Sequence, residues 1–76
     1  MSTKTYKFTP YLLNGAGDWQ YIEGGDWFET SLRRGFSGIS PVAVNGSTVK
    51  VTAFDDNDEE VSSRTYEIRN RKMIRV

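Results

Sequence analysis

The chain contains neither cysteine nor histidine. Without cysteine it has no disulfide framework and no thiolate nucleophile, and without either residue type the usual zinc, copper and haem ligand sets are missing. Catalytic dyads and triads built on histidine are excluded as well, because histidine is the commonest general base in enzymes. We therefore expect a protein that is not an enzyme and that uses no cofactor or metal.

Long apolar segments are also missing. The apolar runs are far too short to span a membrane, and the amino terminus lacks the apolar stretch of a secretory signal. A chain of 76 residues has room for one hydrophobic core, so we expect residues 1–76 to form a single small domain in the cytoplasm. Such cores supply only about 3 to 5 kcal/mol, which keeps homodimerisation open as a further source of stability.

The first part of the chain predicts a β-hairpin. Residues 4–13 alternate imperfectly between the two faces of a strand and contain Pro10, which favours a kinked edge strand. The segment 14–18 is rich in residues that tolerate positive φ, so the chain is expected to reverse there. The second strand of the hairpin is predicted at 19–23.

A short helix is predicted after the glycine pair at 24–25. Asp26 followed by Glu29 has the spacing of a capping box, so the helix is expected to begin at this point. Gly35 and Gly38 limit the helix to about three turns, and Ser40-Pro41 ends any helical tendency. Three apolar residues spaced by four would share its buried face: Phe28, Leu32 and Phe36.

The rest of the chain has the pattern of β-strands. Alternating apolar and polar residues predict strands at 42–44, 48–53, 61–69 and 73–76. Asn45-Gly46 is a strong hairpin signal between the first two of these strands. The whole order predicts an α+β fold: a four- to five-stranded antiparallel sheet with one short helix packed on one face, in the order β-β-α-β-β-β-β.

The register of the last hairpin depends on the length of its loop. A two-residue loop at 70–71 would place Arg75 opposite Tyr66, on the core face of the sheet. A three-residue loop would instead pair Ile68 with Ile74 on the inside and keep the charged residues outside. We therefore predict the three-residue loop.

One helix covers only one face of such a sheet, so the other face meets water or a partner. The sequence holds more large apolar side chains than a short helix can cover. Some of them are expected to form an exposed contact patch: Tyr11, Leu13, Trp19, Tyr21 and Trp27.

The ten basic and ten acidic residues are segregated along the chain. The hairpin loop at 55–60 carries five acidic residues: Asp55, Asp56, Asp58, Glu59 and Glu60. A calcium loop is disfavoured because Val61 occupies the position at which the turn needs glycine. Two interpretations stay open: a solvated turn that blunts aggregation, and a surface that imitates nucleic-acid phosphates or docks into a basic groove.

Basic residues are concentrated at the carboxyl-terminal end. Four of them accompany the last predicted turn and strand: Arg69, Arg71, Lys72 and Arg75. Arginines next to an aromatic residue such as Tyr66 suit contacts to a phosphate backbone. The isoelectric point near 6.2 is lower than that of a committed nucleic-acid binder, so this function is the alternative interpretation.

In its size, its lack of histidine and cysteine and its segregated charge, the chain resembles the small proteins with which phages and mobile elements block host machinery, anti-CRISPR proteins among them. The resemblance extends loosely over the whole chain and implies a non-catalytic viral inhibitor that binds a larger host protein or ribonucleoprotein complex. From the residues, we expect binding through the acidic loop at 55–60, with Trp19 and Tyr21 as aromatic anchors. A nucleic-acid-binding protein and a structural accessory subunit are the alternatives.

Overall fold

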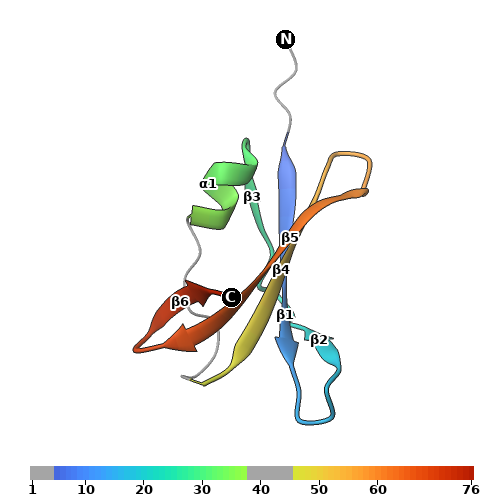
Figure 1. Cartoon of the computed structure of the whole chain (residues 1–76). Helices are drawn as coiled ribbons and strands as arrows, with labels where there is room; N and C mark the ends of the chain where they lie inside the picture. Colours follow the sequence, from blue (N-terminus) through green and yellow to red (C-terminus); the bar gives the residue numbers. More distant parts are fainter. Residues whose placement is uncertain (1–4, 38–45) are drawn as a thin grey trace.

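The computed structural model describes residues 5–37 and 46–76 and contains one antiparallel sheet of six strands with one short helix packed against it (Figure 1). The predicted α+β class is confirmed. The elements are β1 (Tyr6–Leu13), β2 (Trp19–Tyr21), β3 (Trp27–Glu29), α1 (Leu32–Ser37), β4 (Thr48–Phe54), β5 (Glu60–Arg69) and β6 (Lys72–Arg75). Their order in space is β2-β1-β4-β5-β6, and β3 also pairs with β1. The strand predicted at 42–44 lies outside the described residues.

β1 is an interior strand, so the prediction of an edge strand is wrong. β4 pairs with residues 7–12 of β1, while β2 and β3 pair with the two ends of its other edge. Pro10 falls between these two short strands, where its carbonyl accepts a hydrogen bond from the Ile22 N–H at 3.1 Å. The nitrogen and carbonyl of a strand residue point to the same edge. An N–H at position 10 would point to this edge, into the gap between β2 and β3. Neither short strand therefore loses a hydrogen-bond donor because residue 10 is proline.

Residues 27–29 form β3 and not the first turn of a helix, which corrects the helix start predicted at Asp26. Trp27 pairs with Phe8 of β1, and the two rings stack with centroids 5.5 Å apart. This long-range pairing outweighs the local capping signal. Phe28 consequently lies on a strand and is 62% exposed, so the prediction that it shares a buried helix face is wrong as well.

Helix α1 is shorter than predicted and begins later. Ser31 caps it, because its Oγ accepts a hydrogen bond from the Arg34 N–H at 3.1 Å. Gly35 and Phe36 form its buried side. The Trp27 indole Nε1 donates a hydrogen bond to the Gly35 carbonyl at 3.0 Å, which fastens the helix to β3.

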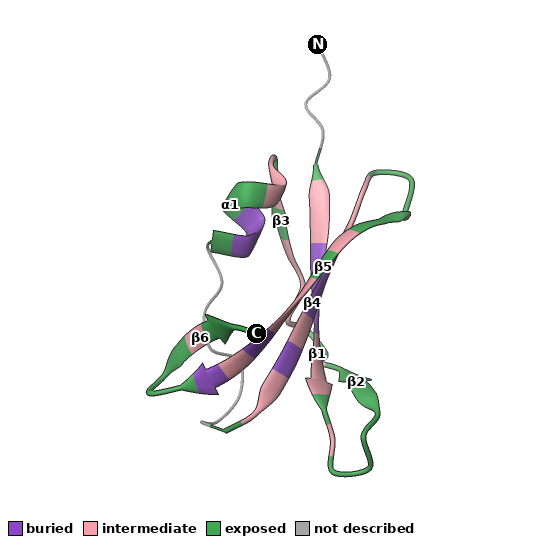
Figure 2. Cartoon of the chain, viewed as in Figure 1, coloured by how far each residue is buried: buried purple, intermediate pink, exposed green. Residues whose placement is uncertain are grey.

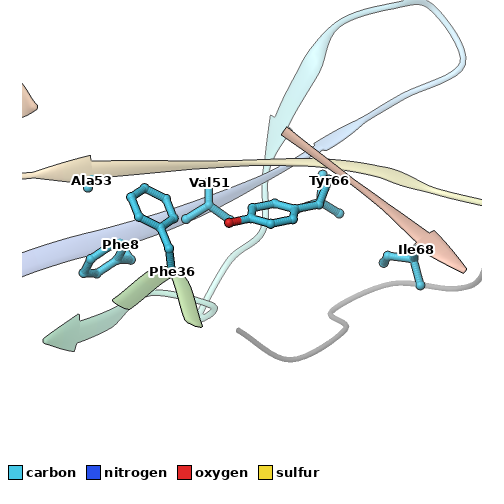
Figure 3. Packing of buried hydrophobic residues seen from close by; sticks show 7 residues of the cluster. Phe8, Phe36, Val51, Ala53, Tyr66 and Ile68 are labelled. Carbon is cyan, nitrogen blue, oxygen red and sulfur yellow. The ribbon is translucent and has the colours of Figure 1, made fainter. Parts of the chain in front are cut away.

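The hydrophobic core lies between α1 and the centre of the sheet (Figures 2 and 3). The Phe36 ring reaches from α1 to the Phe8 ring, and the two meet edge to face with centroids 5.1 Å apart. The Arg64 guanidinium lies 4.4 Å from the centroid of the Phe36 ring. The buried hydrophobic residues are Phe8, Phe36, Val49, Val51, Ala53, Tyr66 and Ile68.

The hairpin between β5 and β6 has a two-residue loop, so the predicted three-residue loop is wrong. Asn70 and Arg71 have φ of 50° and 62°, as a type I′ turn requires, and this turn matches the twist of the paired strands. Arg75 therefore stands opposite Tyr66. Helix α1 contacts β1 and β3, whereas β6 lies at the other edge of the sheet. The Arg75 side chain is therefore exposed to water, and its charge is tolerated on this face.

Two five-residue hairpin loops, at 14–18 and 55–59, have the same pattern of hydrogen bonds. In each, the side-chain oxygen of the first residue, Asn14 or Asp55, accepts from the N–H groups two and four positions later, at 2.8 to 3.0 Å. In each, the N–H of the first residue also donates to the carbonyl of the fifth at 2.9 Å. The fourth residue of each loop has a positive φ. An Asx side chain thus organises both turns.

Candidate functional site: the open face of the sheet

The sheet has a second face that no described helix covers. Side chains opposite each other on paired strands point to the same face, so the register assigns each residue to one of the two faces. We call the face opposite to the core and α1 the open face. It carries Lys7, Thr9, Tyr11, Leu13, Trp19, Tyr21, Phe28, Thr48, Lys50, Thr52, Phe54, Glu60, Ser63, Thr65, Glu67, Arg69, Lys72 and Ile74.

Large apolar side chains gather on the open face. Of the seven exposed large hydrophobic residues among the described positions, five lie on it. They are Leu13, Trp19, Tyr21, Phe28 and Ile74. Exposed apolar surface that collects on one face, instead of being scattered singly, is typical of a contact surface.

A lysine surrounded by aromatic rings lies at one end of the open face. The Lys50 Nζ is 5.0 Å from the centroid of the Trp19 ring and 5.5 Å from that of Tyr11. Tyr21 packs against Tyr11 with ring centroids 6.2 Å apart. We call these four residues the Lys50 cluster. Pairing of β2 and β4 with the two edges of β1 brings them together from three strands.

A second lysine lies among aromatic rings at the other end of the same face. The register places Lys7 of β1 between Phe28 on β3 and Phe54 on β4. The Lys7 Nζ is 5.7 Å from the centroid of the Phe54 ring. We call these three residues the Lys7 cluster. Its Phe28 ring is the most exposed aromatic side chain among the described residues.

A row of hydroxyl side chains crosses the sheet between the two clusters. Thr9, Thr52 and Ser63 stand opposite one another on β1, β4 and β5. Thr9 and Thr52 are buried by their neighbours, and the Thr9 hydroxyl has no hydrogen-bond partner among the described residues. Of this row only Ser63 is exposed, so the middle of the open face carries no aromatic ring between its two aromatic ends.

The open face carries an excess of positive charge. Outside the acidic loop, its four basic residues, Lys7, Lys50, Arg69 and Lys72, stand against one acidic residue, Glu67, for a net charge of +3, and Glu60 of the loop lies opposite Phe54 at the end of the face. Glu67 accepts hydrogen bonds from the guanidinium of Arg69, and this is the one salt bridge within residues 5–37 and 46–76. The two lysines of the clusters lie over aromatic rings and are not paired with carboxylates.

The phenol of Tyr21 lies next to the Asp26 carboxylate. Its hydrogen bond to the Asp26 carboxylate, together with desolvation and the negative charge of that group, raises the pKa of Tyr21 above the ordinary value of 10.0. Asp26 was expected to cap a helix, and instead it lies beside an aromatic ring of the Lys50 cluster.

The structure separates the two parts of the predicted partner-binding site. Trp19 and Tyr21 belong to the Lys50 cluster, whereas the acidic loop, residues 55–60, follows β4 at the opposite end of the sheet (Figure 1). Within the loop, the Asp55 carboxylate accepts two backbone hydrogen bonds and so organises the turn. The other four acidic residues are exposed: Asp56, Asp58, Glu59 and Glu60.

The predicted basic site is also divided. Arg69 and Lys72 lie opposite each other on the open face, whereas Arg75 is opposite Tyr66 on the other face. Arg71 occupies the turn between them. These residues therefore do not form one patch, and two of them extend the positive surface of the open face.

Sequence reasoning missed the lysines of the two clusters. Their signal was present: in the strand segments 7–13 and 48–54, every second residue is a lysine, a threonine, an aromatic residue or a leucine. This alternation indicates a sheet face that is neither packed in the hydrophobic core nor lined only by polar side chains. Lys50 lies beside Trp19 because β2 and β4 both pair with β1. A local sequence pattern does not predict this long-range pairing.

The chain matches no protein-family model, no curated protein and no solved structure. In the part of the chain that the structure describes, no helix has the length and apolar character to cross a membrane. The same residues contain no group of three or more acidic side chains placed to hold a metal ion, and no pocket.

Proposed function

We propose that this protein is a non-catalytic domain that binds single-stranded nucleic acid on the open face of its sheet. The observation that carries the proposal is the Lys50 cluster, in which a cation lies over the rings of Trp19 and Tyr11 and a third ring, Tyr21, packs against Tyr11. Proteins that bind single strands combine basic side chains, which contact the phosphates, with aromatic rings, on which the bases stack.

Each part of the Lys50 cluster has a role in this proposal. A base stacks on the Trp19 ring and displaces the Lys50 ammonium, which then contacts the neighbouring phosphate. Tyr21 supports Tyr11 from the side. Lys72 and Lys7 add positive charge on the same face. A single strand fits better than a duplex because its bases are free to stack.

Fluorescence anisotropy with labelled single-stranded DNA and RNA and with a duplex, each at two salt concentrations, tests the proposal. We expect the single strands to bind and the affinity to fall steeply with salt, by a log–log slope of about −0.7 for each phosphate contact. Trp19→Ala removes a stacking ring worth about 1 to 3 kcal/mol, so affinity falls by about fivefold to a hundredfold. Lys50→Ala makes the slope shallower by about 0.7.

Lys72 and Arg75 provide the matched control. Both are exposed cations on β6, but they lie on opposite faces of the sheet. Lys72→Ala is expected to weaken binding, whereas Arg75→Ala leaves it nearly unchanged. The proposal is wrong when no single strand binds at low salt, or when Trp19→Ala and Lys50→Ala bind as tightly as the unchanged protein.

A second candidate function is the one expected from the sequence, an inhibitor that docks on a larger protein of a nucleic-acid-handling complex. It is supported by the exposure of four acidic side chains in the acidic loop. None of them forms a salt bridge with a described residue. Carboxylates that are free of cations can take the place of phosphates in a basic groove.

The two candidates respond differently to reversal of the loop charge. Asp56→Lys with Glu59→Lys should abolish capture of a basic partner protein from a cell lysate and should strengthen binding of oligonucleotides to the open face. Equal capture by the variant and the unchanged protein, with the same salt dependence of elution, contradicts docking through the acidic loop.

A further inference from the structure

We infer that the Lys7 cluster is a second base-stacking subsite for the same strand, so that one single-stranded nucleic acid runs along β1 from the Lys50 cluster to the Lys7 cluster. This inference rests on the proposed function and defines the length of its ligand. Both clusters lie on the open face, and in both the ammonium group of a lysine lies over an aromatic ring of a neighbouring strand.

The distance between the clusters is set by β1. Lys7 and Tyr11 are four residues apart on this strand. At about 3.3 Å per residue, the two positions are separated by about 13 Å. Both side chains point to the same face because an even number of residues separates them. A ligand that engages both clusters must therefore extend over this distance, which a single nucleotide cannot do.

The surface of the Lys7 cluster is suited to a base. Phe28 is 62% exposed, although it lies on a strand whose neighbouring residue Trp27 stacks in the core. An aromatic ring held by a paired strand and open to solvent loses little conformational freedom when a base stacks on it. The hydroxyl row lies between the clusters. Thr9 and Thr52 are buried in it, so this part of the face presents no aromatic ring and separates the two subsites.

The acidic loop sets the end of this path. It begins directly after Phe54, so the phosphates of a strand that continues beyond the Lys7 cluster would meet five carboxylates. Like charges that approach each other there weaken binding. Affinity should consequently rise when the strand becomes long enough to reach the second cluster and then level off.

The test is a series of labelled oligouridylates and oligothymidylates of increasing length, from about two to about ten nucleotides, within the range that sheet-based single-strand modules cover. We expect weak binding of the shortest strands, a step of at least tenfold at an intermediate length, and a plateau beyond it. Phe28→Ala and Lys7→Ala should remove the step, so that longer strands bind these variants little better than the shortest ones do. Trp19→Ala should weaken binding at every length.

The outcomes separate this inference from the proposed function. Binding of short strands without a step, or a step that persists in Phe28→Ala, overturns the second subsite and leaves binding at the Lys50 cluster intact. Absence of binding at every length overturns both. Arg34→Ala is the control, because Arg34 is an exposed cation on α1, remote from the open face. Circular dichroism confirms that each variant keeps its sheet.

Discussion

At the scale of single residues, Gly35 shows how closely α1 approaches the sheet. A Cβ at this position would lie 1.8 Å from Cζ of the Phe8 ring. Phe8 is fully buried and stacks on Trp27, so its ring has no room to move away. Only glycine lets the helix come this near, although glycine weakens a helix by about 1 kcal/mol relative to alanine.

Gly35→Ala is therefore expected to destabilise the fold. The clash with Phe8 outweighs the gain in helix propensity, and overpacking of this kind costs about 1 to 3 kcal/mol. Urea unfolding followed by Trp fluorescence measures the change. Gly15→Ala is the control, because a Cβ there meets nothing within 4 Å, and it should change stability by less than about 0.5 kcal/mol. Equal stabilities of the two variants would contradict the close approach of α1.

Tyr21 gives a second prediction at this scale, on pH dependence. Its pKa is raised by the hydrogen bond to Asp26, so the phenol loses its proton more readily in the unfolded chain than in the folded one. This contribution to stability is fully present below the ordinary pKa of 10.0 and is lost as the pH rises through the folded value. In an absorbance titration, Asp26→Asn should shift one phenol to lower pH, and Tyr21→Phe should remove that component.

At the scale of elements, the loop at 55–59 depends on the side chain of its first residue. Asp55→Ala removes the acceptor of two backbone N–H groups and is expected to cost about 1 to 2 kcal/mol. Asp55→Asn keeps an acceptor of the same shape and should be close to neutral, as Asn14 performs this task in the other loop. Thermal unfolding of the two variants distinguishes them. Similar melting temperatures would show that the side chain does not organise the loop.

The elements that the sequence predicts well are those specified by neighbouring residues. Alternation in β4 and β5 and the turn residues between them are local signals, and the corresponding hairpin is present. The start of α1 could not be predicted from the cap signal at Asp26, because the pairing of Trp27 with Phe8 joins residues far apart in the chain. The register of β6 was missed for a similar reason: the charge of Arg75 is acceptable on the core face because β6 lies at the edge of the sheet, away from β1 and β3, which α1 contacts.

In the candidate site, too, features specified by neighbouring residues could be predicted from the sequence, and features that depend on strand pairing could not. Parity along β1 already separates Tyr11 from Phe8, so an exposed aromatic patch could be predicted. The position of Lys50 among the rings could not, since it requires knowing that β2 and β4 flank the same strand. The acidic loop was visible as a run of charge, but its distance from Trp19 becomes apparent only in the folded sheet.

At the scale of the whole molecule, the net charge of zero hides two regions of opposite charge. Outside the acidic loop, the open face carries an excess of three positive charges, and the loop carries five negative ones at one end of the sheet. Because the Debye length is about 10 Å at 0.1 M salt, the loop opposes binding of a polyanion to the nearer part of the face.

Neutralising the loop should therefore strengthen nucleic-acid binding. Asp56→Asn with Glu59→Gln is expected to raise the affinity for a ten-nucleotide strand severalfold at low salt and to have little effect near 1 M salt, where the Debye length is about 3 Å. Anisotropy titrations at the two salt concentrations measure this. An affinity that falls at low salt would favour a direct role of the carboxylates in binding.

The two hairpin loops with the same hydrogen-bond pattern show whether the turn itself requires the negative charge of the acidic loop. The loop at 14–18 attains its hydrogen-bond pattern with one carboxylate, whereas the loop at 55–59 carries four. The extra carboxylates are thus not needed to make the turn. The chain contains its own charge-poor version of the acidic loop, and grafting Asn-Gly-Ala-Gly-Asp into positions 55–59 would change the electrostatic field of the molecule while preserving its shape.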